Sequence, residues 1–307
     1  MGTPHADPAE LDLSTFTTEA VDPRYANLDQ MSVLEVATAM NEAEMEVPRA
    51  VNRALPEISA AITAIVGQLG NGGRMFYVGA GTPGRLGILD ASECPPTFST
   101  DPEMVQGIIA GGPSAIINAV EGAEDDYDAG RGLIEKYSIT AGDVVVGVTA
   151  SGRTPFVIGA VDAARELGAV TVGVSSNANA ELSVAAQFPI EVVVGPEIVS
   201  GSTRLKAGSA QKQVLNMLST VTMVQLGKTY GNLMVDVSTT NAKLRVRARN
   251  LVQRVTGASE EVASEALARG EGHVKIASVM ILRSVDAQEA KALLAEAHGN
   301  LRAVLEA

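Results

Sequence analysis

Two short acidic segments contain the residues best suited to moving protons. In segment 90–98 (DASECPPTF), Glu93 comes two residues before a pair of prolines, which are expected to end a helix. A carboxylate near the negative end of a helix dipole, in an apolar site, keeps its proton more tightly and could serve as an acid. A solvated glutamate at a helix end is the competing interpretation.

The second acidic segment, 121–126 (EGAEDD), places Glu121 and Glu124 three residues apart. If the segment is helical, the two side chains share a face, and either could point into a pocket while its neighbours meet water. A run of charges on solvated surface is the alternative, and the residues alone leave it open.

Three glycine- and hydroxyl-rich segments follow predicted strands: 79–82 (GAGT), 149–154 (TASGRT) and 175–177 (SSN). Each could offer backbone N–H groups and hydroxyls to an anion at the start of a helix. Such residues also serve as ordinary turns and helix caps. Three of them on one predicted sheet edge favour a phosphate site, for which the candidates are Gly81, Thr82, Ser151, Gly152 and Thr154.

The first of these loops does not predict a dinucleotide site. Its G-x-G-x-x-G spacing is present, but no acidic residue ends a clear second strand about 20 residues further on.

Segment 195–212 (GPEIVSGSTRLKAGSAQK) combines a turn with an unusual placement of cations. A Gly-Ser-Thr turn is predicted to open a long helix that has Arg204 and Lys206 in its first turn, where positive charges oppose the helix dipole. We therefore expect an anion or a carboxylate partner nearby. Ser202, Arg204 and Lys206 are the binding candidates from this segment.

Cys94 is the single cysteine and could be considered as a nucleophile. The three histidines, His5, His273 and His298, stand in no context that suggests an imidazole partner for it. A buried, inert thiol is the prediction.

The elements that must position these residues alternate along the chain. Short runs rich in β-branched residues are each followed by loop residues and then by sequence compatible with a helix, which predicts a mostly parallel sheet covered on both faces. Ligands of such sheets bind at the carboxyl ends of the strands. The predicted strands are 75–78, 105–110, 144–148, 170–174 and 190–194.

The remaining sequence is predicted to be helical. Ser32 and Glu35 have the spacing of a capping box at the start of the first helix. Apolar residues at steps of three and four then predict an amphipathic helix that ends at the glycines of segment 70–73, so that two helices precede the sheet. Its buried face would consist of Val47, Val51, Leu55, Ile58, Ile62 and Ile65.

Three regions follow from this pattern: a flexible N-terminal tail over 1–26, an α/β domain with N-terminal helices over 27–240, and a helical C-terminal subdomain over 241–307. One long helix is expected over 206–230.

Composition limits the partners. With 307 residues and 46% hydrophobic content the chain can bury a large core, and its formal charge of -13 disfavours nucleic acid and anionic membranes. An aromatic content of 3% without tryptophan provides no row of stacking platforms. No signal peptide or membrane span is predicted, and one cysteine fits a reducing compartment, so we expect a cytoplasmic protein.

Segment 195–212 resembles the signature shared by the N-acetylmuramic acid 6-phosphate etherases and the glucokinase regulatory protein. The resemblance also covers 78–98, 119–125, 145–155 and 231–237, and it spans roughly residues 27 to 305 in all. It implies a sugar isomerase (SIS) fold, which is a three-layer α/β/α sandwich around a five-stranded parallel sheet, and a homodimer.

The resemblance also implies a reaction that needs neither a metal nor a cofactor. N-acetylmuramic acid 6-phosphate and water give N-acetylglucosamine 6-phosphate and D-lactate, so the expected partner is a small amino-sugar phosphate. Glu93 and Glu124 match the family's catalytic glutamates, and we expect Glu124 to be the base and Glu93 the acid. One departure is Pro83, which stands where the family has serine in the first loop.

Two other functions remain open. A noncatalytic sugar-phosphate sensor would resemble the glucokinase regulatory protein, although that protein contains two copies of this architecture. An aldose-ketose isomerase on the same fold would also move a C2 proton with a carboxylate, but its product would be a ketose phosphate without lactate.

Overall fold

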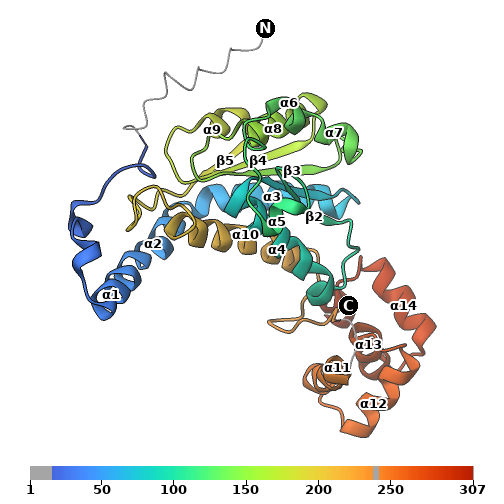
Figure 1. Ribbon diagram of the computed structural model, residues 1–307. Helices are drawn as coiled ribbons and strands as arrows, with labels where there is room; N and C mark the ends of the chain where they lie inside the picture. Colours follow the sequence, from blue (N-terminus) through green and yellow to red (C-terminus); the bar gives the residue numbers. More distant parts are fainter. Residues whose placement is uncertain (1–15, 238–241, 307) are drawn as a thin grey trace.

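The computed structural model describes residues 16–237 and 242–306, and Figure 1 shows their arrangement. Five parallel strands form one sheet in the order β2-β1-β3-β4-β5, which confirms the predicted fold class. The fifth predicted strand is shifted, since the strand occupies residues 188–191 instead of 190–194. The strands are β1 (Met75–Gly79), β2 (Val105–Ile109), β3 (Val144–Val148), β4 (Val170–Ser175) and β5 (Phe188–Glu191).

Helices cover both faces of the sheet, so that three layers result (Figure 1). The alternation of side chains along β1 builds both cores, because Met75 and Tyr77 pack on one face while Phe76 and Val78 pack on the other. The first face carries α3 (Leu55–Gly70), α4 (Gly81–Phe98) and α10 (Lys206–Gln225). The second face carries α6 (Tyr127–Arg131), α7 (Leu133–Lys136), α8 (Pro155–Leu167) and α9 (Glu181–Ala185), and α5 (Ser114–Ile117) follows β2.

The N-terminal helices begin as predicted and then break. The capping box is confirmed, since the Ser32 N–H donates to Glu35 Oε2 at 2.7 Å and the Glu35 N–H donates to Ser32 Oγ at 3.4 Å. The prediction of two helices before the sheet was wrong, because the second one breaks at residue 54: Pro56 has no N–H to continue the helix, and Leu55 is 41% exposed. The result is three helices, α1 (Val33–Glu44), α2 (Glu46–Arg53) and α3.

Helix α4 continues through both prolines, which corrects the expected helix end. Pro95 and Pro96 lie inside the helix, and it ends at Phe98 with Ser99 in the left-handed conformation. The φ angle of proline is compatible with a helix, so the two residues remove hydrogen bonds without forcing the chain out. Glu93 therefore lies more than one turn before the helix end.

The N-terminal segment 16–26 is held against the domain, so the flexible tail was wrong for these residues. Thr18 is 1% exposed, and its Oγ1 accepts a hydrogen bond from Asn177 Nδ2 at 2.9 Å. Two 3-10 helices, η3 (Pro23–Tyr25) and η4 (Leu28–Gln30), lead on to α1. Residues 1–15 of the predicted tail lie outside the described residues.

The C-terminal helices lie together at the lower right of Figure 1 and form a core of their own. Val235 and Val237 belong to that core, which favours a domain boundary before them and not near residue 240. Helix α10 ends at Gln225, short of the predicted residue 230, because Gly227 turns the chain with a φ of 73°. The helices are α11 (Ala242–Thr256), α12 (Glu260–Arg269), α13 (Val274–Arg283), α14 (Ala287–Glu296) and α15 (Leu301–Glu306).

Within residues 16–237 and 242–306, none of the helices combines the length and the apolar character that crossing a membrane requires.

Candidate functional site

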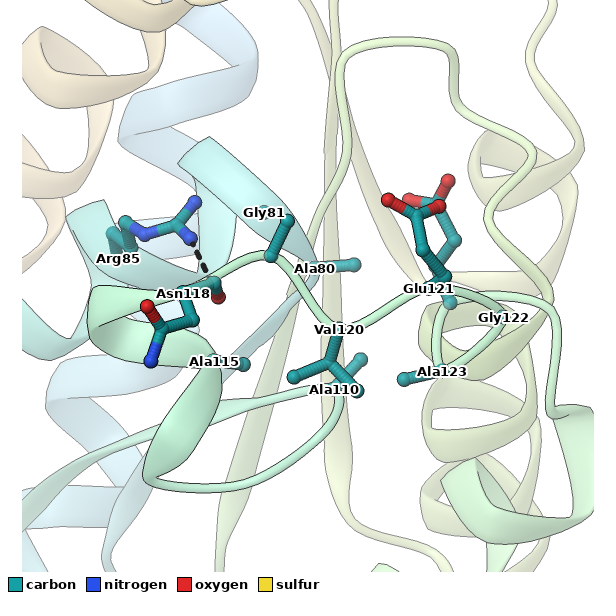
Figure 2. A pocket seen from close by; sticks show the side chains of 12 residues that line it. Ala80, Gly81, Arg85, Ala110, Ala115, Asn118, Val120, Glu121, Gly122 and Ala123 are labelled. Atoms are coloured by element: carbon teal, nitrogen blue, oxygen red, sulfur yellow. Dashed lines mark hydrogen bonds between the residues drawn. The ribbon is translucent and has the colours of Figure 1, made fainter.

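A cavity of about 170 Å³ opens at the carboxyl edge of the sheet, beside the start of α4. Gly81 and Arg85 line it from α4, and segment 118–124 lines it from the chain that follows β2. Figure 2 shows Arg85 and Glu121 on opposite sides of the cavity with Gly81 between them. The cavity therefore combines a helix start with an acidic segment.

The start of α4 is arranged to leave backbone donors free. Strand and helix touch directly at Gly79, where a Cβ atom would lie 2.6 Å from the Gly84 nitrogen. Ala80, which precedes the helix, has no polar side chain to cap it, and the N–H groups of Gly81 and Thr82 have no partner within the helix. Pro83 at the third helical position has no N–H, and the departure from the family sequence thus removes one donor but leaves two.

Glu124 lies where the acidic segment meets the start of α8. The backbone N–H of Phe156, near the start of α8, donates to the Glu124 carbonyl oxygen at 3.0 Å. Burial raises the pKa of the Glu124 carboxyl above its ordinary value, and the charges of Asp125 and Glu121 raise it further. Glu124 therefore holds its proton more tightly than an ordinary glutamate does.

The loop after β3 gathers three hydroxyl groups next to Glu124. Thr149 Oγ1 lies 2.6 Å from Thr154 Oγ1 and 3.2 Å from Ser151 Oγ. Gly152 is buried with a φ of 76°, and a Cβ atom there would lie 2.3 Å from Ala180 Cβ. No side chain caps α8. Hydroxyl groups are thus presented beside a second helix start on the same sheet edge, where the Phe156 N–H is already bonded to Glu124.

The expected carboxylate partner of the 195–212 segment is present, and this prediction is confirmed. Glu197 is 1% exposed and accepts hydrogen bonds from the backbone N–H groups of Lys206 at 3.1 Å and Ala207 at 2.9 Å. The Lys206 side chain is buried and donates from Nζ to the Val194 carbonyl at 2.9 Å. Burial raises the pKa of Glu197 and lowers the pKa of Lys206.

The other two candidates of this segment precede α10. Ser202 is half-buried and Arg204 is exposed. Helix α10 reaches the first loop one turn later, since a Cβ atom at Gly208 would lie 3.5 Å from Thr82 Cγ2. The segment thus borders the cluster of loops, although Ser202, Arg204 and Lys206 do not line the cavity.

Glu93 is not brought to this cavity within one chain. Its side chain is exposed, and it does not line the cavity. Thr82 and Glu93 are eleven residues apart on the continuous helix α4, which separates them by roughly 16 Å along the axis.

Cys94, the next residue of α4, is buried as predicted, and burial raises the pKa of its thiol to about 12.

The roles of two residues at the site, Arg85 and Asn177, were not predicted from the sequence. Arg85 lines the cavity and donates from Nε to the Ile116 carbonyl at 2.8 Å, which fixes the turn that leads to the acidic segment. Its position one turn after Gly81 was the available signal. Asn177 was noted within its loop, but its contacts with the N-terminal segment could not be foreseen.

Two family models match the chain, namely the glucokinase regulatory protein N-terminal SIS domain over residues 57–165 and the C-terminal lid domain of glucokinase regulatory protein over residues 231–275. Among solved structures, a phosphoheptose isomerase from Francisella tularensis has a TM-score of 0.51 at 19% identity, covering 63% of this chain and 100% of that one. This likeness concerns the fold.

Curated relatives match almost the whole chain. An N-acetylmuramic acid 6-phosphate etherase from Streptomyces avermitilis is 55% identical over 99% of this chain and 97% of its own length. The protein of the same name from Oenococcus oeni is 53% identical, covering 94% of this chain and 97% of its own. Identity of this extent, through both the α/β domain and the C-terminal helices, means that the chain belongs to the N-acetylmuramic acid 6-phosphate etherase family.

Proposed function

We propose that the protein cleaves the D-lactyl ether of N-acetylmuramic acid 6-phosphate, giving N-acetylglucosamine 6-phosphate and D-lactate in the recycling of cell-wall sugars. The observation that supports this most directly is the cavity, where Glu124, with its raised pKa, lies beside the uncapped start of α4. The full-length relatives carry the same activity in their name.

The phosphate is assigned to the two helix starts on the sheet edge. The free N–H groups of Gly81 and Thr82 and the hydroxyls of Ser151 and Thr154 are donors, and the positive ends of two helix dipoles favour an anion. The chain can therefore hold a phosphate despite its net charge of -13, because contacts at short range dominate.

The reaction needs one base and one acid. In the open-chain sugar, the C2 proton lies next to the aldehyde, and a base removes it. The C3–O bond then breaks, the electron pair leaves with the lactyl oxygen, and an acid protonates that oxygen. Water adds across the resulting C2–C3 double bond, with its hydroxyl on C3 and a proton returned to C2.

The roles that we propose for the two glutamates are opposite to those expected from the sequence. Because burial and two neighbouring carboxylates raise its pKa, Glu124 is suited to donate a proton to the departing lactate. Glu93, the other glutamate of the expected catalytic pair, is left as the base. This assignment requires Glu93 to approach a substrate that is bound roughly 16 Å from it along its own helix.

A second copy of the chain would supply Glu93. Thr82, Leu86, Leu89 and Glu93 follow steps of four, three and four and therefore lie on one face of α4, where Leu89 is 52% exposed. If two α4 helices pack antiparallel across a two-fold axis, Thr82 faces Glu93 of the partner subunit while Leu86 faces Leu89 of the partner subunit. Both pairs are centred on the same point of the helix.

The size of the cavity agrees with a shared site. At about 170 Å³ it is smaller than the roughly 300 to 1,000 Å³ of typical small-molecule sites, and a partner subunit would extend its wall. A homodimer and a cytoplasmic location are parts of this proposal.

Mixing two inactive variants tests the proposal. Glu93→Gln and Glu124→Gln are each expected to release almost no lactate. If they are unfolded together and refolded as mixed dimers, half the dimers contain both variants and one intact site each, so roughly a quarter of the parental activity returns. Refolded Glu93→Gln alone is the control.

Three outcomes would contradict the proposal. Parental lactate release by Glu93→Gln would remove Glu93 from the chemistry. An inactive mixture of confirmed mixed dimers would exclude the shared site. Binding of N-acetylmuramic acid 6-phosphate by the parental protein without lactate release would indicate a sensor instead of an enzyme.

A further inference from the structure

The N-terminal segment 16–22 crosses the loops at the carboxyl edge of the sheet. Thr18 and Asp22 are buried in it. The guanidinium of Arg153, from the loop after β3, lies over the Phe16 ring at 4.4 Å from its centre. Ser200, from the segment before α10, donates from Oγ to the Glu19 carbonyl at 3.3 Å. The segment thus joins loops that are far apart in sequence.

Asn177 is the residue through which this segment reaches the loop after β3. Its side chain is 3% exposed, and its Oδ1 accepts hydrogen bonds from Thr17 Oγ1 at 2.7 Å and from the Thr18 N–H at 3.4 Å. Its Nδ2 donates to Thr18 Oγ1 at 2.9 Å and to the carbonyls of Ala150 and Ser151, both at 3.3 Å. One amide therefore binds the N-terminal segment and the backbone of segment 150–151 at once.

The bonds of this amide use both of its polar atoms. A carboxamide is the side chain that can accept and donate in one plane, and the Thr18 hydroxyl supplies an acceptor that a hydrocarbon cannot replace. Because these groups are buried, removing one partner leaves the others without a hydrogen bond, and the loop can then relax away from its position.

We infer that Thr18 and Asn177 are positioning residues, which hold segment 150–154 in the conformation that binds the sugar phosphate. The inference rests on the proposed function only in assigning the phosphate to this loop. It predicts a role for the N-terminal segment in substrate affinity, although residues 16–22 do not line the cavity. The hydroxyls of Ser151 and Thr154 are the groups whose placement depends on it.

Thr18→Val tests the inference, since valine has nearly the same shape and lacks the hydroxyl. We expect KM for N-acetylmuramic acid 6-phosphate to rise about tenfold, with kcat changed less than about twofold, because one buried hydrogen bond is lost away from the reacting atoms. Thr18→Ser should restore KM. Thr63→Val is the matched control, because Thr63 Oγ1 donates to the Ser59 carbonyl at 2.9 Å on the exposed side of α3.

A direct binding measurement separates this inference from the proposed function. Calorimetric titration with inorganic phosphate measures the affinity of the loop for phosphate, whether or not lactate is released. Thr18→Val and Asn177→Ala should both bind phosphate about tenfold more weakly than the parental chain. A lower melting temperature with unchanged phosphate affinity would show a purely structural contact and overturn the inference. A fall in kcat at constant KM would overturn it as well.

Discussion

The backbone N–H of Phe156 donates to the carbonyl oxygen of Glu124 at 3.0 Å, and this bond joins the acidic segment to the hydroxyl-rich loop. Through it, a carboxyl group with a raised pKa lies beside the start of α8. Four predictions follow from this arrangement and from the helices around it, and each concerns a different part of the chain.

Glu124→Gln should lower kcat for lactate release by about 10² to 10⁴, the usual contribution of a positioned acid or base. Glutamine keeps the size of the side chain and removes the proton that can be donated. Glu121→Gln is the matched control, because Glu121 lines the same cavity and is assigned no proton transfer. An enzymatic assay for D-lactate measures both, and equal losses in the two variants would contradict the assignment.

The pH dependence of kcat/KM should show the acid role of Glu124. Since its pKa is raised, Glu124 keeps its proton to a higher pH than an ordinary glutamate, and activity falls as the pH rises through that pKa. Asp125→Asn removes one of the charges that raise the pKa, so this fall should begin at lower pH. An unmoved or upward-shifted profile in the Asp125 variant would argue against Glu124 as the donor.

Leu89→Asp should separate the proposed dimer, because a charge would be buried in the seam between two α4 helices. Sedimentation should show monomers, and lactate release should fall with dimer content. Val184→Asp is the control: Val184 is 78% exposed on α9, across the sheet from α4, and the variant should stay dimeric and active. A dimeric Leu89→Asp would place the contact elsewhere.

Lys275→Met should destabilise the C-terminal subdomain by about 3 kcal/mol, because it leaves a largely buried carboxylate with a weaker partner. Lys275 Nζ lies 2.6 Å from Asp236 Oδ2, whereas Lys228 Nζ lies 3.5 Å from the same atom. Lys291→Met, which removes the exposed pair with Glu271, should cost less than about 1 kcal/mol. Urea unfolding followed by circular dichroism compares them, and similar losses would contradict the prediction.

Much of the fold could be predicted from the chain because the relevant signals are local. The capping box of Ser32 and Glu35, the β-branched strands and the glycine loops each depend on neighbouring residues, and these predictions were confirmed apart from the shift of β5. The continuation of helix α4 through Pro95 and Pro96 was not predictable in this way. Helix α4 persists through Pro95 because its packing on β2 and α10 compensates for the lost hydrogen bonds.

For the candidate site, too, local sequence signals and tertiary contacts contributed different information. The sequence by itself determined which groups are candidates for the chemistry: two glutamates, three loops rich in donors and a cation-bearing helix start. Only the tertiary structure decided that Glu197 neutralises that helix start, that Asn177 receives the N-terminal segment, and that Glu93 lies far from the cavity in its own chain. These relations join residues that are distant in sequence, and a contact of that kind is set by how the layers pack, which no local pattern encodes.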